Sequence, residues 1–180
     1  LIIFDLDGTL VDSDQTVIKI LNTIRADLRL SPLKLKDIVF FLSMGGEDMI
    51  KKTIESKKDV KKYLAIFRQR YLEDSLSNEA LFDGVINYLN HLKRKKIDMA
   101  IFTNKLKDLK NKTLKRHHIY DYFKYIVTSE DVSFKKPSPD GIYKLIEMSS
   151  IAKENVIMIG DSELDQKAAS LASIDFIYHN

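Results

Sequence analysis

The sequence contains no cysteine among its 180 residues. This absence excludes disulfide bonds, thiolate zinc sites and thiol nucleophiles together. Any covalent chemistry must therefore use an oxygen or nitrogen nucleophile, and carboxylates are the expected ligands of a metal ion.

Long hydrophobic runs are also absent. No apolar segment approaches the roughly 20 residues that a membrane-spanning helix needs, and no segment has the pattern of a signal peptide. We therefore expect a cytoplasmic protein with no membrane partner. Residue 1 is a leucine within an apolar run rather than an initiator methionine, and the last residues end as abruptly, so we expect the sequence to be trimmed at both ends.

A strong charge of either sign is missing as well. The chain has 29 Lys and Arg against 26 Asp and Glu, a net charge of +3. With so small an excess and no motif of stacking aromatic residues, we expect no nucleic-acid partner. Residues 14–80 hold 13 basic and 10 acidic residues and so carry the whole excess, which we interpret as lysines on a solvated helix surface.

Five apolar segments have the composition of buried strands, and segments of helical period separate them. This alternation predicts a parallel sheet covered by helices on both faces, a three-layer α/β fold. The expected strands are residues 1–5, 97–104, 124–129, 155–161 and 174–178. The expected helices of this part are residues 84–96, 105–117, 138–149 and 163–172.

Residues 14–80 interrupt this alternation, because they contain no convincing strand and are far longer than one crossover helix. We predict that they form an inserted helical unit, and that residues 1–13 and 81–180 form the α/β core. Ser31 and Pro32 have the pattern of an N-cap and first helical residue, and predict that a helix begins there. The other helices expected in the insert are near residues 17–28, 47–57 and 59–75.

The opening stretch "LIIFDLDGTLVDS" ends a buried strand in two carboxylates, Asp5 and Asp7. In a parallel α/β sheet, ligands bind beyond the carboxyl ends of the strands. One carboxylate can attack phosphorus, and a second can protonate the leaving oxygen and later take a proton from water. Gly8 lets backbone amides turn toward a phosphoryl group, although Asp and Gly also favour turns with no function.

Two other predicted strand ends carry polar side chains suited to the same reaction. Thr103 and Asn104 offer a hydroxyl and an amide that can orient a phosphoryl oxygen, although both are also common capping residues. Lys135 and Lys136 precede Pro137, and a lysine there can neutralise charge on a nucleophile and a phosphate. An exposed lysine before a helix-opening proline is the alternative.

The fourth strand ends in "MIGDSELD", which puts Asp161 at the strand tip and Asp165 one helical turn further on. Ser162 is the expected N-cap of the following helix. Asp161 together with Asp5 makes a suitable oxygen site for Mg²⁺. The alternative is a helix start that uses acidic residues to suit the helix dipole.

Taken in order, these motifs resemble those of the haloacid dehalogenase superfamily of phosphohydrolases, and the resemblance covers the whole chain. It implies a Rossmann-like core with a five-stranded parallel sheet, and the insert resembles the C1 cap of that superfamily. The stretches "DLDGTLVDS", "FTNK", "TSEDV", "KKPSPDG" and "IGDSELD" are most similar to the phosphoglycolate phosphatase-like branch.

The resemblance implies a catalytic role for four residues. Asp5 would be the nucleophile, Asp7 the general acid and base, and Thr103 a phosphate ligand with Asn104 beside it. Lys136 would be the electrostatic partner of the phosphoryl group. Superfamily members that act as dehalogenases lack the second acid of the first motif, so the presence of Asp7 argues against dehalogenation.

The resemblance also implies the metal ligands. Asp5, the backbone carbonyl of Asp7, and Asp161 would hold Mg²⁺. Asp165 would support this site from behind the direct ligands or hold Lys136.

Met44, Gly45 and Gly46 interrupt an apolar run, and the resemblance suggests that they form a specificity loop that binds substrate, whereas the alternative is a plain connection between helices. His117 and His118 have no carboxylate partner at a recognisable spacing, so we expect them to be structural or on the surface.

The expected activity is Mg²⁺-dependent hydrolysis of a small phosphorylated metabolite, similar to 2-phosphoglycolate, by a monomer or weak homodimer. The first alternative is a phosphomutase of the β-phosphoglucomutase type. The second motif of that type usually carries serines, so "TNK" favours a hydrolase. The second alternative is a regulatory protein that kept the fold without catalysis, and the retained acids and Lys136 argue against it.

Overall fold

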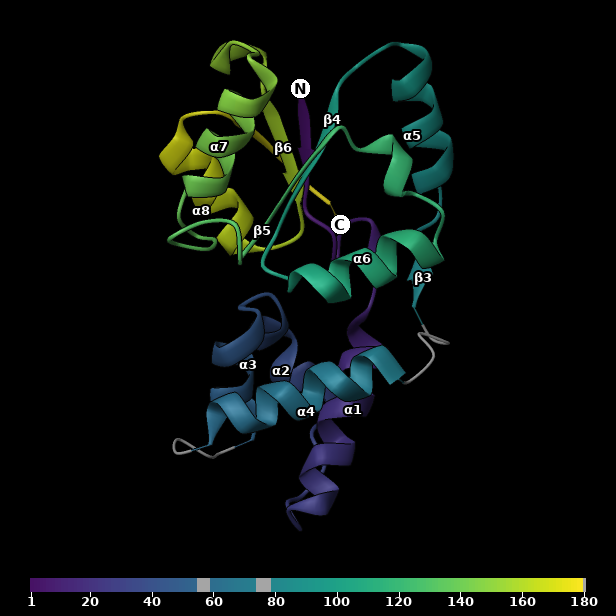
Figure 1. Cartoon of the computed structure of the whole chain (residues 1–180), viewed down its shortest axis with the longest axis vertical. Coiled ribbons are helices and arrows are strands. Elements are labelled where there is room, and N and C mark those ends of the chain that lie inside the picture. The colour runs from purple at the N-terminus through teal and green to yellow at the C-terminus, as the bar shows by residue number, and fades with distance from the viewer. Residues whose placement is uncertain (55–58, 74–78, 180) are drawn as a thin grey trace. The chain divides into compact units, whose positions relative to one another are not determined.

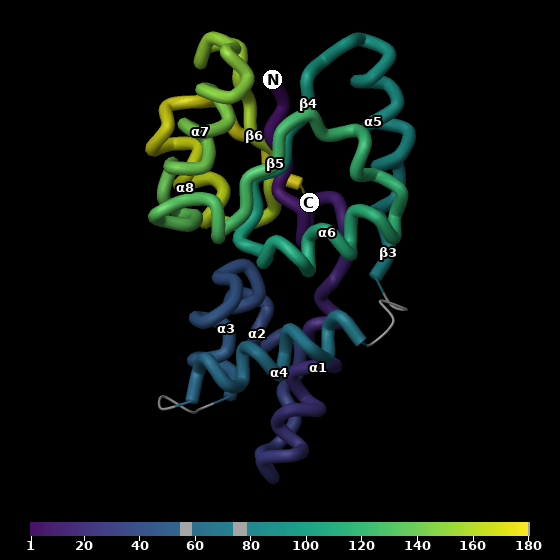
Figure 2. The backbone as a smooth tube through the Cα atoms, in the orientation of Figure 1, coloured from purple at the N-terminus to yellow at the C-terminus, as the bar shows by residue number. Residues whose placement is uncertain are grey.

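The computed structural model describes residues 1–54, 59–73 and 79–179. The chain forms two compact units, residues 1–12 with 80–180, and residues 13–79. Each boundary lies one residue before the predicted one. The first unit therefore contains strand β2 (Val11–Asp12) before the second unit in the chain and strand β3 (Ala80–Leu81) after it. Figure 2 traces the backbone from the purple N-terminus and labels β3.

The first unit is built on a five-stranded parallel sheet in the order β5-β4-β1-β6-β7 (Figure 1). The strands are β1 (Ile2–Phe4), β4 (Met99–Thr103), β5 (Tyr125–Thr128), β6 (Ile157–Gly160) and β7 (Asp175–Tyr178). The predicted sheet is therefore confirmed. The first strand of the chain lies at its centre, and Phe4 is aligned with Ile101 on one side and Ile159 on the other.

Helices cover both faces of this sheet, as Figure 1 shows. Helices α7 (Asp140–Ser149) and α8 (Glu163–Ala172) pack on one face, and α5 (Val85–Arg94) and α6 (Lys107–Arg116) on the other. Successive residues of a strand point to opposite faces, so Ile3 joins the first core and Phe4 the second. The three-layer prediction is confirmed. Two short 3₁₀ helices, Tyr120–Tyr122 and Lys153–Asn155, lie in connections.

The second unit contains four helices among its described residues: α1 (Asp14–Asp27), α2 (Leu35–Leu42), α3 (Gly46–Thr53) and α4 (Val60–Glu73). Helix α1 packs against α4, and α3 packs against both α2 and α4. The buried Arg25 links them, because its guanidinium donates to the carbonyls of Ser31 and Thr53. The predicted helix ends at 55–57 and 74–75 lie outside the described residues.

Two sequence-based expectations about the predicted insert are corrected. The predicted insert ends in β3, which pairs antiparallel with β2, and two-residue strands are too short to show a periodic pattern. No helix begins at Ser31 and Pro32, because α2 starts at Leu35. The side chain of Asn22 instead fixes Leu33, accepting from its N–H at 2.7 Å and donating to its carbonyl at 3.0 Å.

None of the helices in the described ranges has both the length and the apolarity to cross a membrane.

Gly141 in the first turn of α7 provides a test of packing between helix and sheet. A Cβ added at Gly141 would lie 2.2 Å from Cε2 of Phe102 on β4. Alanine favours helices over glycine by about 1 kcal/mol, but overpacking a core costs about 1–3 kcal/mol. We expect Gly141→Ala to lower the free energy of unfolding, measured by urea denaturation, because the phenyl ring is fully buried.

The matched control is Glu147→Ala, which changes an exposed residue of the same helix and should leave the midpoint nearly unchanged. Equal or higher stability of Gly141→Ala would contradict the close approach of α7 to the sheet.

Candidate active site

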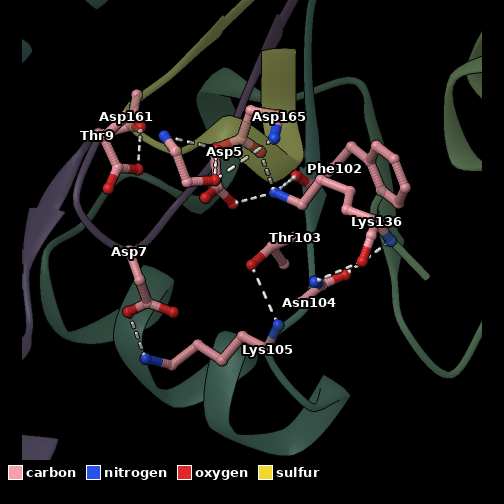
Figure 3. A network of polar contacts seen from close by, with 11 residues as sticks. Asp5, Asp7, Thr9, Phe102, Thr103, Asn104, Lys105, Lys136, Asp161 and Asp165 are labelled. Atoms are coloured by element: carbon pink, nitrogen blue, oxygen red, sulfur yellow. Dashed lines mark hydrogen bonds and ion pairs between the residues drawn. The ribbon is translucent and has the colours of Figure 1, made fainter. Parts of the chain in front are cut away.

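The candidate active site lies at the carboxyl ends of three adjacent strands, β4, β1 and β6. Asp5 directly follows β1, Thr103 is the last residue of β4, and Asp161 directly follows β6. Adjacent parallel strands end at the same edge of a sheet, so the register of β1 with its two neighbours brings these side chains together. Lys136 from the loop after β5 and Asp165 from α8 complete the cluster (Figure 3).

The Lys136 side chain is 2% exposed and lies between two carboxylates. Its Nζ donates to Asp165 Oδ1 at 2.6 Å and to the Phe102 carbonyl at 3.0 Å, and lies 2.8 Å from Asp5 Oδ1. Two oxygens thus accept hydrogen bonds from the ammonium, and the Asp5 carboxylate lies beside it as an ion pair. Burial by itself would lower the pKa of this ammonium, but Asp165 and Asp5 hold the pKa above its ordinary value. Lys136 is therefore a fixed positive charge beside Asp5.

The side chain of Asn104 fixes the backbone of this lysine. Asn104 Oδ1 accepts from the Lys136 N–H at 3.0 Å, and Asn104 Nδ2 donates to the Lys136 carbonyl at 3.1 Å. Both residues are buried, so this pair of hydrogen bonds ties the end of β4 to the loop that carries the lysine. The structure gives the amide this positioning task, and its contact with substrate stays a prediction.

Asp5, Asp161 and Asp165 offer carboxylate oxygens that all lie within 4.8 Å of one another. Oxygen ligands of this kind suit a hard divalent cation. When all three carboxylates are ionised, one ammonium leaves two negative charges uncompensated, and a divalent cation would neutralise them. Among the described residues, the buried Asp5 Oδ1 also lacks a donor in hydrogen-bonding geometry. The residues present therefore fit a divalent metal site.

The two oxygens of the fully buried Asp165 have different partners. Oδ1 accepts from Lys136, whereas Oδ2 accepts from the backbone N–H of Ser162 at 3.1 Å and from its hydroxyl. The hydroxyl accepts in turn from the Asp165 N–H, so a capping box begins α8 and the predicted N-cap is confirmed. Of the two roles that the resemblance implies for Asp165, this geometry favours holding Lys136.

Asp161 approaches the loop after β1 closely. The Thr9 hydroxyl donates to Asp161 Oδ1 at 3.1 Å. Gly8 has a φ of +79°, and a Cβ there would lie 2.3 Å from Asp161 Oδ2, so both the backbone and the available space require glycine. The Gly8 N–H donates to the Val11 carbonyl at 2.9 Å, which means that this amide stabilises the turn. Binding of a phosphoryl group at Gly8 stays a prediction.

The acids of the cluster shift one another's pKa. Desolvation raises the pKa of Asp5 to about 8, with Lys136 opposing the shift and Asp165 and Asp161 adding to it. The pKa of Asp161 is raised as well, by desolvation first and then by Asp165. A bound divalent cation would oppose these shifts, because it favours ionised carboxylates.

Asp7 points toward a residue that sequence reasoning missed. Lys105 Nζ donates to Asp7 Oδ1 at 2.7 Å, and the lysine side chain is only 6% exposed (Figure 3). The backbone N–H of Lys105 donates to the Thr103 hydroxyl oxygen at 3.1 Å. In a chain rich in surface lysines, the only signal for Lys105 was its place directly after the strand-end pair Thr103 and Asn104.

The remaining predicted residues lie outside this cluster. Gly45 is the N-cap of α3 and Gly46 its first residue, in the second unit, so their binding of substrate stays a prediction. His117 lies at the end of α6, and its Nε2 is buried with no hydrogen-bond partner among the described residues. Desolvation, and then the charges of Arg116 and Lys105, lower the pKa of His117, which keeps it neutral at pH 7.

Fold and site together define a Rossmann-like α/β enzyme whose acidic cluster at the strand ends suits phosphoryl chemistry. The sequence profile of the haloacid dehalogenase-like hydrolases matches residues 2–179. The chain belongs to this family, in its phosphoglycolate phosphatase-like branch, and is an enzyme of the phosphatase class.

Similar proteins support this assignment along most of the chain. A phosphoglycolate phosphatase of Aquifex aeolicus is 29% identical over 171 residues, which cover 95% of this chain and 80% of that protein. A phosphoglycolate phosphatase of Agrobacterium fabrum is 30% identical over 183 residues, which cover 98% and 78%. The crystal structure of a predicted phosphoglycolate phosphatase from Haemophilus somnus shares the fold with a TM-score of 0.92 at 23% identity, covering 98% of this chain and 83% of that one.

The two adjacent lysines that precede Pro137 provide a test of the buried charge. Lys136→Met removes the ammonium that separates two buried carboxylates, and breaking a buried pair in this way costs about 3–5 kcal/mol. We expect that loss in the free energy of unfolding, measured by urea denaturation at pH 7 with a chelator present.

Lys135→Met is the matched control, because Lys135 is only partly buried, and its loss should cost about 1 kcal/mol or less. Equal losses for the two variants would mean that Lys136 is not the charge that balances the acids.

Proposed function

We propose that the chain is a Mg²⁺-dependent phosphatase that hydrolyses a small phosphate monoester of the 2-phosphoglycolate kind through a phosphorylated Asp5. The observation that carries this proposal is the Asp5 carboxylate, buried at the end of the central strand beside a fixed ammonium and two further carboxylates. The similarity to proteins named phosphoglycolate phosphatase supports the class of substrate.

In the first half-reaction, an oxygen of Asp5 attacks phosphorus and the bond between phosphorus and the leaving oxygen breaks. The leaving oxygen takes a proton from Asp7. Lys136 offsets negative charge on the nucleophile and the phosphoryl group. The Thr103 hydroxyl, whose oxygen accepts from Lys105, directs its hydrogen to a phosphoryl oxygen.

In the second half-reaction, water attacks the phosphorus of the acyl phosphate and gives its proton to Asp7. The bond between phosphorus and the Asp5 oxygen breaks, so inorganic phosphate leaves and the carboxylate of Asp5 is restored. One acid therefore serves as proton donor in the first step and as proton acceptor in the second.

The metal ligands proposed for this reaction are Asp5, Asp161 and the backbone carbonyl of Asp7, with Asp165 holding Lys136. When bound, Mg²⁺ would supply charge neutralisation and would orient the phosphate against the nucleophile. The all-oxygen donor set and the two uncompensated negative charges support this choice of metal.

The helical insert is proposed as a cap that sets substrate choice. Residues 14–80 carry the whole net charge of +3, which would favour a leaving group with its own negative charge, such as the carboxylate of 2-phosphoglycolate. The turn that contains Gly45 and Gly46 is the proposed specificity segment. A cytoplasmic location and a monomeric or weakly dimeric state remain predictions.

The decisive experiment is a panel of phosphate esters assayed for release of inorganic phosphate with Mg²⁺, with Ca²⁺ and after chelation. We expect hydrolysis of small monoesters, 2-phosphoglycolate among the better ones, and negligible release from phosphoproteins. Chelation should abolish the activity and Mg²⁺ should restore it. Ca²⁺ should restore it poorly, because its larger and irregular coordination would misplace the nucleophile.

Full activity after exhaustive chelation would contradict the metal requirement. Transfer of the phosphoryl group to a second sugar hydroxyl, with little inorganic phosphate released, would favour the phosphomutase alternative instead. No turnover of any ester would favour the regulatory one.

Two substitutions in the first motif should have different effects. Asp5→Asn removes the nucleophile, so turnover should disappear. Asp7→Asn removes the proton donor and acceptor but keeps the backbone carbonyl, so the rate should fall by about 10² to 10⁴ while Mg²⁺ still binds. Steady-state kinetics and metal titration by calorimetry measure both effects.

Wild-type protein purified in parallel is the reference for contaminating phosphatases. Turnover of Asp5→Asn near the wild-type level would rule out the covalent mechanism.

A further inference from the structure

The proposed reaction assigns no role to the ion pair between Lys105 and Asp7. Lys105 Nζ donates to Asp7 Oδ1 at 2.7 Å, and the side chains are 6% and 32% exposed. An ion pair on the open surface contributes little to stability. Here the lysine side chain is almost completely buried, and the Asp7 carboxylate compensates its charge. The carboxylate is therefore held in a defined direction.

The two ends of Lys105 contact two different groups of the site. Its backbone N–H donates to the Thr103 hydroxyl oxygen at 3.1 Å, and its ammonium donates to Asp7. Thr103 ends β4, whereas Asp7 belongs to the loop after β1 (Figure 3). Lys105 thus bridges the proposed phosphate ligand and the proposed proton donor, which come from neighbouring strands.

The backbone of Asp7 is fixed independently of this contact. In the same loop, the Gly8 N–H donates to the Val11 carbonyl at 2.9 Å, and the N–H groups of Leu10 and Val11 both donate to the Leu6 carbonyl at 3.0 Å. The loop therefore fixes the position of the Asp7 Cα, and the ion pair fixes the direction in which its carboxylate points.

We infer that Lys105 is a positioning residue for proton transfer. It holds the Asp7 carboxylate where it can protonate the leaving oxygen of a phosphoryl group bound by Thr103. The inference rests on the proposed function, because it assigns Lys105 to the step in which Asp7 protonates the leaving oxygen. A misplacement of about 1 Å in such a group can cost 10²-fold in rate.

The test compares leaving groups that need a proton with one that does not. Lys105→Met keeps the length and apolar stem of the side chain and leaves the backbone contact to Thr103 in place. For an alkyl phosphate, whose leaving oxygen must be protonated, we expect kcat/KM to fall by about 10- to 100-fold. For 4-nitrophenyl phosphate, whose leaving group departs as an anion, we expect less than about a threefold change. The ratio kcat/KM reports the steps through leaving-group departure.

A double-mutant cycle separates positioning from other roles. In the Asp7→Asn background, Lys105→Met should cause no further loss, because the group that it positions is already gone. The matched control is Lys107→Met, which removes a lysine that is 60% exposed and pairs with Asp131 at 3.4 Å, and its kinetics should equal those of the wild type.

The absence of cysteine permits a chemical rescue. Lys105→Cys introduces a single thiol, and alkylation by 2-bromoethylamine in urea, followed by refolding beside wild type treated in the same way, restores an ammonium at nearly the original length. Hydrolysis of the alkyl phosphate should recover in the alkylated protein.

Several results would overturn the inference. These are equal losses on both esters, a rise in KM confined to substrates that carry a second anionic group, or a further loss in the Asp7→Asn background. Wild-type protein that hydrolyses neither ester would instead overturn the proposed function itself, and the two failures are therefore distinguishable.

Discussion

The site depends on one buried ammonium between two buried carboxylates. Removing Lys136 from water costs several kcal/mol, and the attraction of Asp5 and Asp165 offsets this cost only because hydrogen bonds fix the geometry on both sides. Asp165 Oδ2 is held by Ser162 at the start of α8, and the lysine backbone is held by Asn104 at the end of β4. The proposed nucleophile, Asp5, therefore faces a charge whose position two separate elements determine.

The central place of β1 explains why this geometry can be rigid. The strand is hydrogen-bonded on both edges and packed on both faces, by Ile3 into one core and Phe4 into the other. Close packing gives such a strand little freedom to shift. The residue that directly follows it is Asp5, so the most constrained segment of the fold carries the proposed nucleophile.

The polar residues around Asp5 form a layer in which each group orients another. Thr9 orients Asp161, Ser162 orients Asp165, and Lys105 contacts both Thr103 and Asp7. Electrostatic stabilisation works best when donors and charges are already in place before the reaction, since reorientation during the step is then avoided. In the proposed reaction, some residues of this layer would therefore act through a neighbour.

The sequence by itself determined the class of fold and the members of the main cluster. Apolar runs alternating with helical periods specify a parallel sheet, because only strands buried on both faces lack a polar side. Polar residues that directly follow those runs must meet at one edge of the sheet. This rule predicted a common site for Asp5, Thr103, Asp161 and the Lys135–Lys136 pair. The short strands β2 and β3 could not be recognised, because two residues carry no periodicity.

Only the tertiary structure decided which groups are partners. The residue pattern alone left Lys135 and Lys136 equivalent, and the family resemblance favoured Lys136. The structure shows the difference directly, because Lys136 is buried between two carboxylates. The residue pattern also gave no reason to single out Lys105, whose significance comes from Asp7, 98 positions away along the chain. Partnerships of this kind depend on distances set by the register of β1 and β4 and by the loops that follow them. Local sequence patterns describe the neighbourhood of each residue along the chain, whereas charge pairs form between residues that folding brings together.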